Sequence, residues 1–223
     1  MILSADAPGG FSAPPGHRAS ALLLRLGPVD EAGARAQARD GARAFINATR
    51  ALAGAPPVFV QIAPVRTPVH DADLDALAGA WPDGVFLEAC EGRADVQALS
   101  AKLAAREAMA GVAEGATRIV ALAAQTPAGV FALGGYGQAS ARLAGLALDD
   151  GPLPGDAQAK ATVRTLLALG AAAAGVPALL IAPAGVGPTL AAACAAARRE
   201  GFSGMLARFP GQIPAIEAAL AGP

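Results

Sequence analysis

Eight short apolar segments recur along the chain, and most are followed by an alanine-rich segment whose apolar residues have helical spacing. The apolar segments cover residues 1–4, 21–24, 58–63, 84–87, 118–122, 144–148, 178–181 and 205–208. Strands that alternate with helices favour a parallel sheet that is covered by those helices. Eight such units predict an α/β fold of the (β/α)8 or TIM-barrel type, and 223 residues suit one such domain over residues 1–223.

Helical spacing also predicts which side chains face the sheet. One stripe is formed by Ala38, Ala42, Phe45, Thr49 and Leu52, a second by Leu190, Cys194 and Ala197, and a third by Ile213, Ile216 and Leu220. Asp71 or Asp73 is the expected cap of a short helix that carries Leu74 and Leu77. Between the first two strands, the Pro- and Gly-rich residues 8–16 predict that the first helix is absent or reduced to a turn.

Charge and cysteine content narrow the class of protein. The chain has 17 Lys and Arg against 18 Asp and Glu, without a basic run that includes aromatic residues, so nucleic acid is not an expected partner. Cys90 and Cys194 lack disulfide or zinc spacing, and no signal-peptide pattern begins the chain, so we expect a cytoplasmic protein. The uncharged stretch between Arg164 and Arg198 is interrupted by Gly and Pro and is not expected to span a membrane.

In a (β/α)8 barrel the functional side chains lie at the carboxyl ends of the strands. The residues expected there are Ser4, Arg25, Ala63, Glu88, Ala123, Asp149, Ala182 and Phe209. Few of them can act as an acid, a base, a nucleophile or a metal ligand. The sequence therefore predicts a clear scaffold with little of the chemistry usual for this position.

One candidate site is the glycine-rich stretch at residues 185–189, which follows the seventh apolar segment and opens a helix. The free N–H groups around Gly187 and Thr189 can bind a phosphate or a carboxylate there, and barrels often bind phosphate at this place. Pro188 suits the first helical position. A tight turn without a ligand is the alternative interpretation.

Acidic residues form a second candidate site. Glu88 and Glu91 follow the fourth apolar segment, and Asp149 and Asp150 follow the sixth. Carboxylates at a barrel mouth can hold Mg²⁺, which prefers hard oxygen ligands. Paired acids before a Gly-Pro turn are also ordinary turn formers, so both interpretations stay open.

Four stretches carry a family resemblance. They are GFSGMLARFPGQ at residues 201–212, ALAAQTPAGV at 121–130, DGVFLEACE at 83–91 and ASALLLRLGP at 19–28. In order and spacing they resemble motifs of the citrate lyase beta chain and malyl-CoA lyase family, within the HpcH/HpaI aldolase/citrate lyase superfamily. The resemblance extends over nearly the whole chain, from Ala19 to Leu220.

The resemblance implies a Mg²⁺-dependent barrel enzyme that makes or breaks a C–C bond beside an acyl thioester, usually a CoA ester. It also implies an oxo-acid on the metal and an arginine on its carboxylate or enolate. At the matching positions this chain has Gln61 for that arginine, Gln125 for the metal-binding glutamate, Ala89 for a lysine and Phe209 for a histidine, whereas Glu91 is kept.

The acids that the family carries after its sixth strand match Gly151 and Pro152, unless a two-residue deletion puts Asp149 and Asp150 in their place. The leading hypothesis is therefore a barrel without the family's normal catalytic set. We expect it to need no cofactor, to bind Mg²⁺ weakly, and to bind an acyl-CoA or a small carboxylate. We also expect it to act as a homo-oligomer or as a partner subunit.

Two alternatives remain. One is a working carbon–carbon lyase or aldolase on a CoA thioester or small oxo-acid, in which Asp149, Asp150 and Glu91 form a rearranged Mg²⁺ site. The other is a barrel enzyme with metal-free chemistry at the same mouth, for which the sequence indicates no nucleophile.

Overall fold

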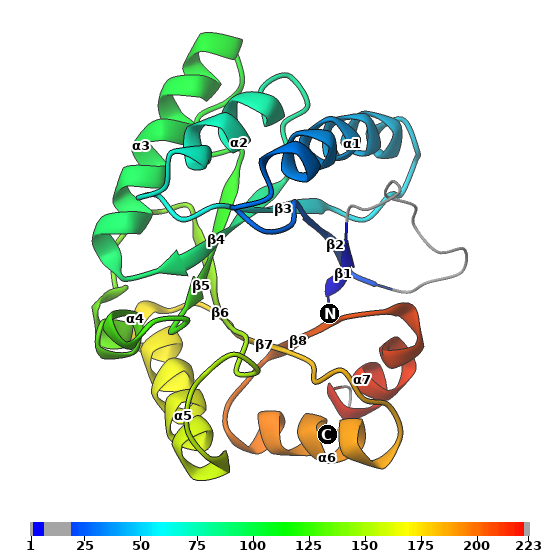
Figure 1. Cartoon of the computed structure of the whole chain (residues 1–223), viewed down its shortest axis with the longest axis vertical. Helices are drawn as coiled ribbons and strands as arrows, with labels where there is room; N and C mark the ends of the chain where they lie inside the picture. The colour runs from blue at the N-terminus through cyan, green and yellow to red at the C-terminus, as the bar shows by residue number, and fades with distance from the viewer. Residues whose placement is uncertain (1, 7–18, 221–223) are drawn as a thin grey trace.

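Eight parallel strands follow one another in chain order and close into a barrel in the computed structural model, which describes residues 2–6 and 19–220 (Figure 1). The strands are β1 Ile2–Asp6, β2 Ala21–Arg25, β3 Val58–Ile62, β4 Gly84–Cys90, β5 Arg118–Ala123, β6 Leu143–Leu148, β7 Ala178–Ile181 and β8 Gly204–Ala207. The barrel closes because β1 pairs with β2 on one side and with β8 on the other.

The predicted α/β fold with a parallel sheet is confirmed. The strand bounds differ from the apolar segments by at most two residues, except that β4 continues to Cys90 through an irregular pairing with β5. The stretch at residues 8–16, where we predict a reduced first helix, lies outside the described residues.

Helices surround the barrel in Figure 1. They are α1 Ala32–Arg50, α2 Val69–Leu77, α3 Arg93–Ala110, α4 Pro127–Phe131, α5 Ala157–Ala174, α6 Pro188–Arg199 and α7 Ile213–Leu220, with 3-10 turns η1 Leu133–Gly135 and η2 Pro210–Gln212. The predicted faces of α6 and α7 are largely confirmed, since Leu190, Cys194, Ala197, Ile213 and Ile216 are buried. Within residues 19–220, no helix is both long and apolar enough to cross a membrane.

Two expectations about helices are wrong. Leu52 lies beyond the end of α1 and is 66% exposed, because the helix ends at Arg50 and Ile46 takes the buried position instead. Neither Asp71 nor Asp73 is a cap, since α2 begins after Pro68 and both residues lie inside it. Asp73 is instead fully buried and pairs with Arg35 of α1 at 2.6 Å, a partner that helix-cap reasoning does not consider.

The interior of the barrel is filled by apolar side chains. Its buried cluster consists of Leu23, Phe86, Val120, Leu122, Ala147 and Leu206. Phe59 packs edge-to-face on Phe86 with ring centroids 5.7 Å apart. The barrel is thus a packed core rather than a pore, and polar side chains can enter it only at its ends.

Candidate functional site

Within residues 19–220, five polar side chains line the carboxyl end of the barrel. Each lies two residues after a side chain that fills the interior, so the alternation of faces along a strand directs it into the mouth. We call this set the mouth layer: Arg25 of β2, Gln61 of β3, Glu88 of β4, Asp149 after β6 and Arg208 after β8. The layer carries two positive charges, two acidic groups and one amide.

An ion pair joins two members of the mouth layer across β7. Arg208 Nη2 lies 3.0 Å from Asp149 Oδ1 and 3.2 Å from Oδ2, and Arg208 Nε donates to the carbonyl oxygen of Ala182 at 2.7 Å. Arg208 Nη1 has no hydrogen-bond partner among the described residues. The guanidinium is therefore held in place with one edge left for a further acceptor.

The backbone of Arg208 is held by a buried amide. Gln212 Oε1 accepts from Arg208 N at 2.8 Å, and Gln212 Nε2 donates to Pro183 O at 2.7 Å and to Gly185 O at 2.8 Å. Gln212 is fully buried, so these bonds are shielded from water. They tie the end of β8 to the loop that precedes α6.

On the opposite side of the mouth, Gln61 and Glu88 are bonded to each other. Gln61 Nε2 donates to Glu88 Oε1 at 2.7 Å, and Gln61 is buried. Burial raises the pKa of the Glu88 carboxyl, whereas the bond from Gln61 and the charges of Arg35 and Arg25 lower it in part. The net result is a half-buried acid whose pKa lies above its usual range.

The backbone beside Glu88 is strained. Ala89 has φ +42° and Ala124, after β5, has φ +61°, both in the left-handed region that alanine adopts at a cost of roughly 1–2 kcal/mol. Gln125 Oε1 accepts from Ala89 N at 2.7 Å and holds this geometry. Strained residues of this kind gather where a structure must aim a functional side chain.

Glu91 lies outside the mouth layer. Its carboxylate accepts from Thr126 Oγ1 at 2.7 Å and from Arg66, and both bonds lower its pKa. Its backbone N–H donates to Asp95 Oδ2 at 2.8 Å. These contacts hold the loop between β4 and α3.

The structure does not bring Asp149 and Asp150 onto a common point. Asp149 pairs with Arg208, whereas Asp150 pairs with Arg164 of α5 at 2.7 Å. Arg164 in turn binds Glu200 at 2.7 Å. The two carboxylates therefore form ion pairs with different arginines.

This donor set does not fit a Mg²⁺ ion as arranged. Asp149, Asp150 and Glu91 are each paired with an arginine, and the oxygen of Gln125 is bound to a backbone N–H. In the described part of the chain, no group of three or more His, Cys, Asp or Glu side chains could hold a metal ion. A metal would have to replace existing ion pairs rather than enter a prepared site.

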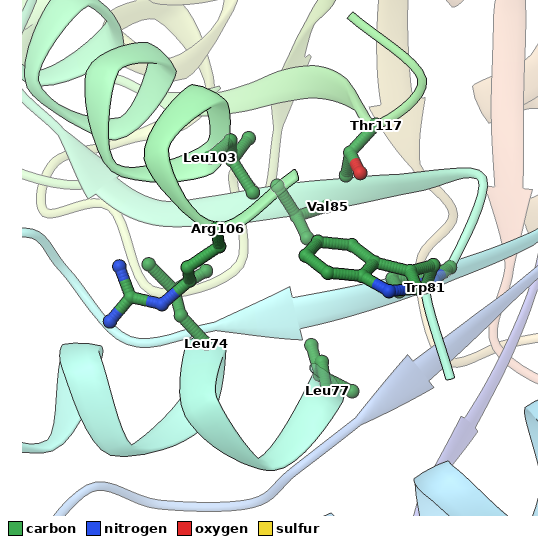
Figure 2. Close-up of a pocket in the computed structure, with 8 residues that line it drawn as sticks. Leu74, Leu77, Trp81, Val85, Leu103, Arg106 and Thr117 are labelled. Carbon is green, nitrogen blue, oxygen red and sulfur yellow. The ribbon is translucent and has the colours of Figure 1, made fainter. Parts of the chain in front are cut away.

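A small hollow lies at the other end of the barrel, between α2 and α3 (Figure 2). Leu74, Leu77, Trp81 and Leu103 line it, and the buried hydroxyl of Thr117 has no partner among the described residues. Thr117 precedes β5, so the hollow lies at the amino end of the strands, away from the mouth layer. We assign it no part in the site.

Solved structures share this architecture. RipC from Yersinia pestis has 21% identity and a TM-score of 0.78 over 100% of this chain and 94% of its own. The citrate lyase beta subunit from Mycobacterium tuberculosis has 23% identity and a TM-score of 0.73 over 99% of this chain and 96% of its own. The chain has the fold of citrate lyase beta subunits. A structure of the M. tuberculosis protein CitE with magnesium, acetoacetate and coenzyme A matches at 20% identity and TM-score 0.72, over 100% of this chain and 80% of its own. No protein-family model and no curated sequence matches the chain.

Within the citrate lyase beta fold, Gly187 and Thr189 lie where we expected, at the start of α6. Gly187 has φ +66° and directly precedes Pro188, the first residue of α6. Both Gly187 and Thr189 are exposed. The bonds from Gln212 to Pro183 and Gly185 connect this loop to Arg208. Anion binding at this helix start stays a prediction.

Sequence reasoning missed Arg208 as a member of the site. It placed Phe209 at the end of β8, but Phe209 is 37% exposed and Arg208 is the residue that faces Asp149. Counting in steps of two from the interior Leu206 leads to Arg208. The same counting from Phe59 leads first to Gln61, which the family resemblance had already singled out and which lies one step before Ala63.

Proposed function

We propose that this chain is a divergent member of the citrate lyase beta-like group in the HpcH/HpaI superfamily. In this proposal it is a (β/α)8 barrel with a reduced first helix that binds a small carboxylate such as a 2-oxo acid, or an acyl-CoA. Arginine rather than Mg²⁺ holds the ligand. The M. tuberculosis structures with acetoacetate, oxaloacetate and magnesium support small oxo-acids as the ligand class.

The observation that carries the proposal is Arg208. Its guanidinium donates from Nε to Ala182 O and from Nη2 to Asp149. The side chain is 28% exposed, and Nη1 is left for a ligand. A guanidinium binds carboxylates through two parallel N–H bonds, which an ammonium group cannot do. A ligand carboxylate can bind Nη1, or can replace Asp149.

The same site is poorly suited to the chemistry that the resemblance implies. By the family resemblance, Gln61 occupies the position of the family's arginine and Gln125 that of its metal-binding glutamate. One fixed positive charge and one negative charge are then missing from the site. Loss of one transition-state contact of this kind commonly lowers a rate by about 10²–10³. We therefore expect weak Mg²⁺ binding and negligible cleavage of malyl-CoA.

Calorimetric titration with acetoacetate and pyruvate, in EDTA and in Mg²⁺, tests the proposal. We expect binding in EDTA that weakens at least tenfold in Arg208→Gln and stays unchanged in Arg199→Gln, which removes an exposed arginine from α6. Thermal unfolding of both variants checks that they are folded. Binding that requires Mg²⁺, or native affinity in Arg208→Gln, would contradict the proposal.

A working Mg²⁺-dependent lyase is the second candidate, because related folds bind magnesium with oxo-acids. In that case Asp149 and Asp150 must leave Arg208 and Arg164 to reach the ion. Titration with Mg²⁺ of the native chain and of Asp149→Asn/Asp150→Asn separates the two candidates. Micromolar binding that disappears in the double variant, together with cleavage of malyl-CoA, would favour the lyase.

The proposal also includes a cytoplasmic location and assembly as a homo-oligomer or with a partner subunit. Cys90 and Cys194 are both free and buried, which fits a reducing compartment.

A further inference from the structure

Glu88 is the acidic member of the mouth layer that no arginine neutralises by direct contact within the described residues. Within the described residues, the Glu88 side chain accepts a hydrogen bond from Gln61 Nε2 at Oε1, at 2.7 Å, and its Oε2 has no hydrogen-bond partner. Asp149, in contrast, is paired with Arg208. Oε2 of Glu88 is therefore held in a defined position and can accept a proton or a hydrogen bond from a ligand.

The protein holds this carboxyl in a defined place. Gln61 is buried and fixes one oxygen, while Phe86, two residues before Glu88, packs against Phe59 in the barrel interior below. Ala89, directly after Glu88, is held at φ +42° by the bond from its N–H to Gln125. A strained residue beside a half-buried acid is consistent with a side chain that is aimed for a function.

The surroundings of Glu88 make it a stronger proton acceptor than an ordinary glutamate. The charged groups that act on Glu88 are Arg35 and Arg25, which favour the carboxylate, and Asp73, which disfavours it. Burial outweighs the arginines, and the pKa of Glu88 is raised above its ordinary value. A base is most effective when its pKa approaches the working pH.

We propose that Glu88 takes a proton from, and returns it to, the carbon next to the carbonyl of a 2-oxo acid bound in the barrel mouth. This inference rests on the proposed function, since the ligand must first bind there. Glu88 Oε2 forms an O–H bond as the C–H bond breaks, and the C–H electron pair forms the C=C bond of an enolate. The negative charge moves to the former carbonyl oxygen, near the mouth arginines, and no oxidant or reductant is needed.

Return of the proton completes a cycle without net change of the ligand. In D₂O the proton on Glu88 exchanges with solvent, so the returning atom is deuterium. The reaction is therefore visible as loss of the ligand's C–H signal even when no product forms. Arg25 adds positive charge near the developing enolate, as its effect on the Glu88 pKa indicates.

The experiment follows the methyl signal of pyruvate by proton NMR in D₂O, in parallel samples with and without EDTA, for the native chain, Glu88→Gln and Glu114→Gln. Glutamine keeps an oxygen that can accept the bond from Gln61, and Glu114→Gln is a matched change at an exposed residue in the loop between α3 and β5. We expect the native chain and Glu114→Gln to accelerate exchange equally. Glu88→Gln should lose about 10²-fold or more of that acceleration, with pyruvate affinity within about threefold of native. The native rate should also rise with pH through a midpoint above the usual range of a glutamate.

Pyruvate titrations run in parallel separate the two ways to fail. Binding without accelerated exchange, or equal exchange in Glu88→Gln and the native chain, would overturn the role of Glu88 and leave the proposed function intact. Absence of binding and exchange together would overturn both. A native exchange rate that disappears in EDTA would assign the step to a bound metal rather than to Glu88.

Discussion

Replacement of Glu107 by glutamine is expected to destabilise the amino end of the barrel strongly. Glu107 lies near the end of α3 and is fully buried, and its carboxylate accepts two bonds from Arg142, at 2.8 and 2.6 Å. It also accepts from Gly115 N at 2.9 Å and Thr117 N at 3.0 Å. One side chain thus ties α3 to the starts of β5 and β6.

The magnitude follows from the pKa. Burial by itself raises the pKa of Glu107, but the bonds from Arg142, Thr117 N and Gly115 N outweigh it and lower the pKa from 4.5 to about 2. At about 1.4 kcal/mol for each pKa unit, the ionised carboxylate contributes roughly 3 kcal/mol to folding. Because the pKa is lower in the folded state, this contribution is complete above pH 4.5 and is lost as the pH falls toward 2, with about 1.4 kcal/mol left at pH 3.

Glu107→Gln removes the charge and leaves the guanidinium of Arg142 buried without its partner, a change that typically costs about 3–5 kcal/mol. For a chain of this size we expect the Tm to fall by roughly 6–20 °C. Urea unfolding at pH 7 and pH 3 measures the effect, with Glu114→Gln as the control. A difference from native below about 1 kcal/mol at pH 7, or one that does not shrink at pH 3, would refute the reasoning.

Two further predictions concern backbone geometry. Gly170→Ala places a methyl group against the carbonyl oxygen of Leu133 and should lower the free energy of unfolding by about 1–3 kcal/mol, measured in urea. Gly33→Ala is the matched change in α1, where nothing lies within 4 Å of the new methyl group, and should be neutral or stabilising by up to about 1 kcal/mol. Equal effects of the two substitutions on the free energy of unfolding would contradict the close contact between Gly170 and the carbonyl oxygen of Leu133. Ala89→Gly relieves a left-handed alanine and should leave stability unchanged or raise it by about 1 kcal/mol, whereas a loss above 1 kcal/mol in the same assay would show that Ala89 is not strained.

The strands and the helices could be predicted because their signals are local. Each strand could be located from an apolar segment of strand length between alanine-rich segments. The observed and predicted bounds differ most in β4, which ends at Cys90 rather than at residue 87. Leu190, Cys194 and Ala197 were predicted as the buried face of α6 from their spacing alone, and they are buried. Asp73 shows the limit of such reasoning, because its partner Arg35 lies 38 residues away on another helix.

The candidate site could be predicted only in part. The family resemblance predicts that Gln61 and Gln125 take the places of charged residues, and this stays a prediction. The structure shows only that each glutamine forms a hydrogen bond near the carboxyl ends of the strands. The sequence did not indicate that Glu88 bonds to Gln61, or that Arg208 binds Asp149. Both contacts depend on which face of a strand each side chain occupies.

The sequence by itself determined an alternating α/β chain, whereas the loss of charge at positions that the family resemblance marks stays a prediction. Only the tertiary structure decided which polar side chains share the mouth. A side chain reverses its direction when the strand phase changes by one residue, so the choice between Arg208 and Phe209 cannot be made without the strand in place. The partners Asp149 and Arg208 are 59 residues apart, and closure of the barrel brings them within 3.0 Å.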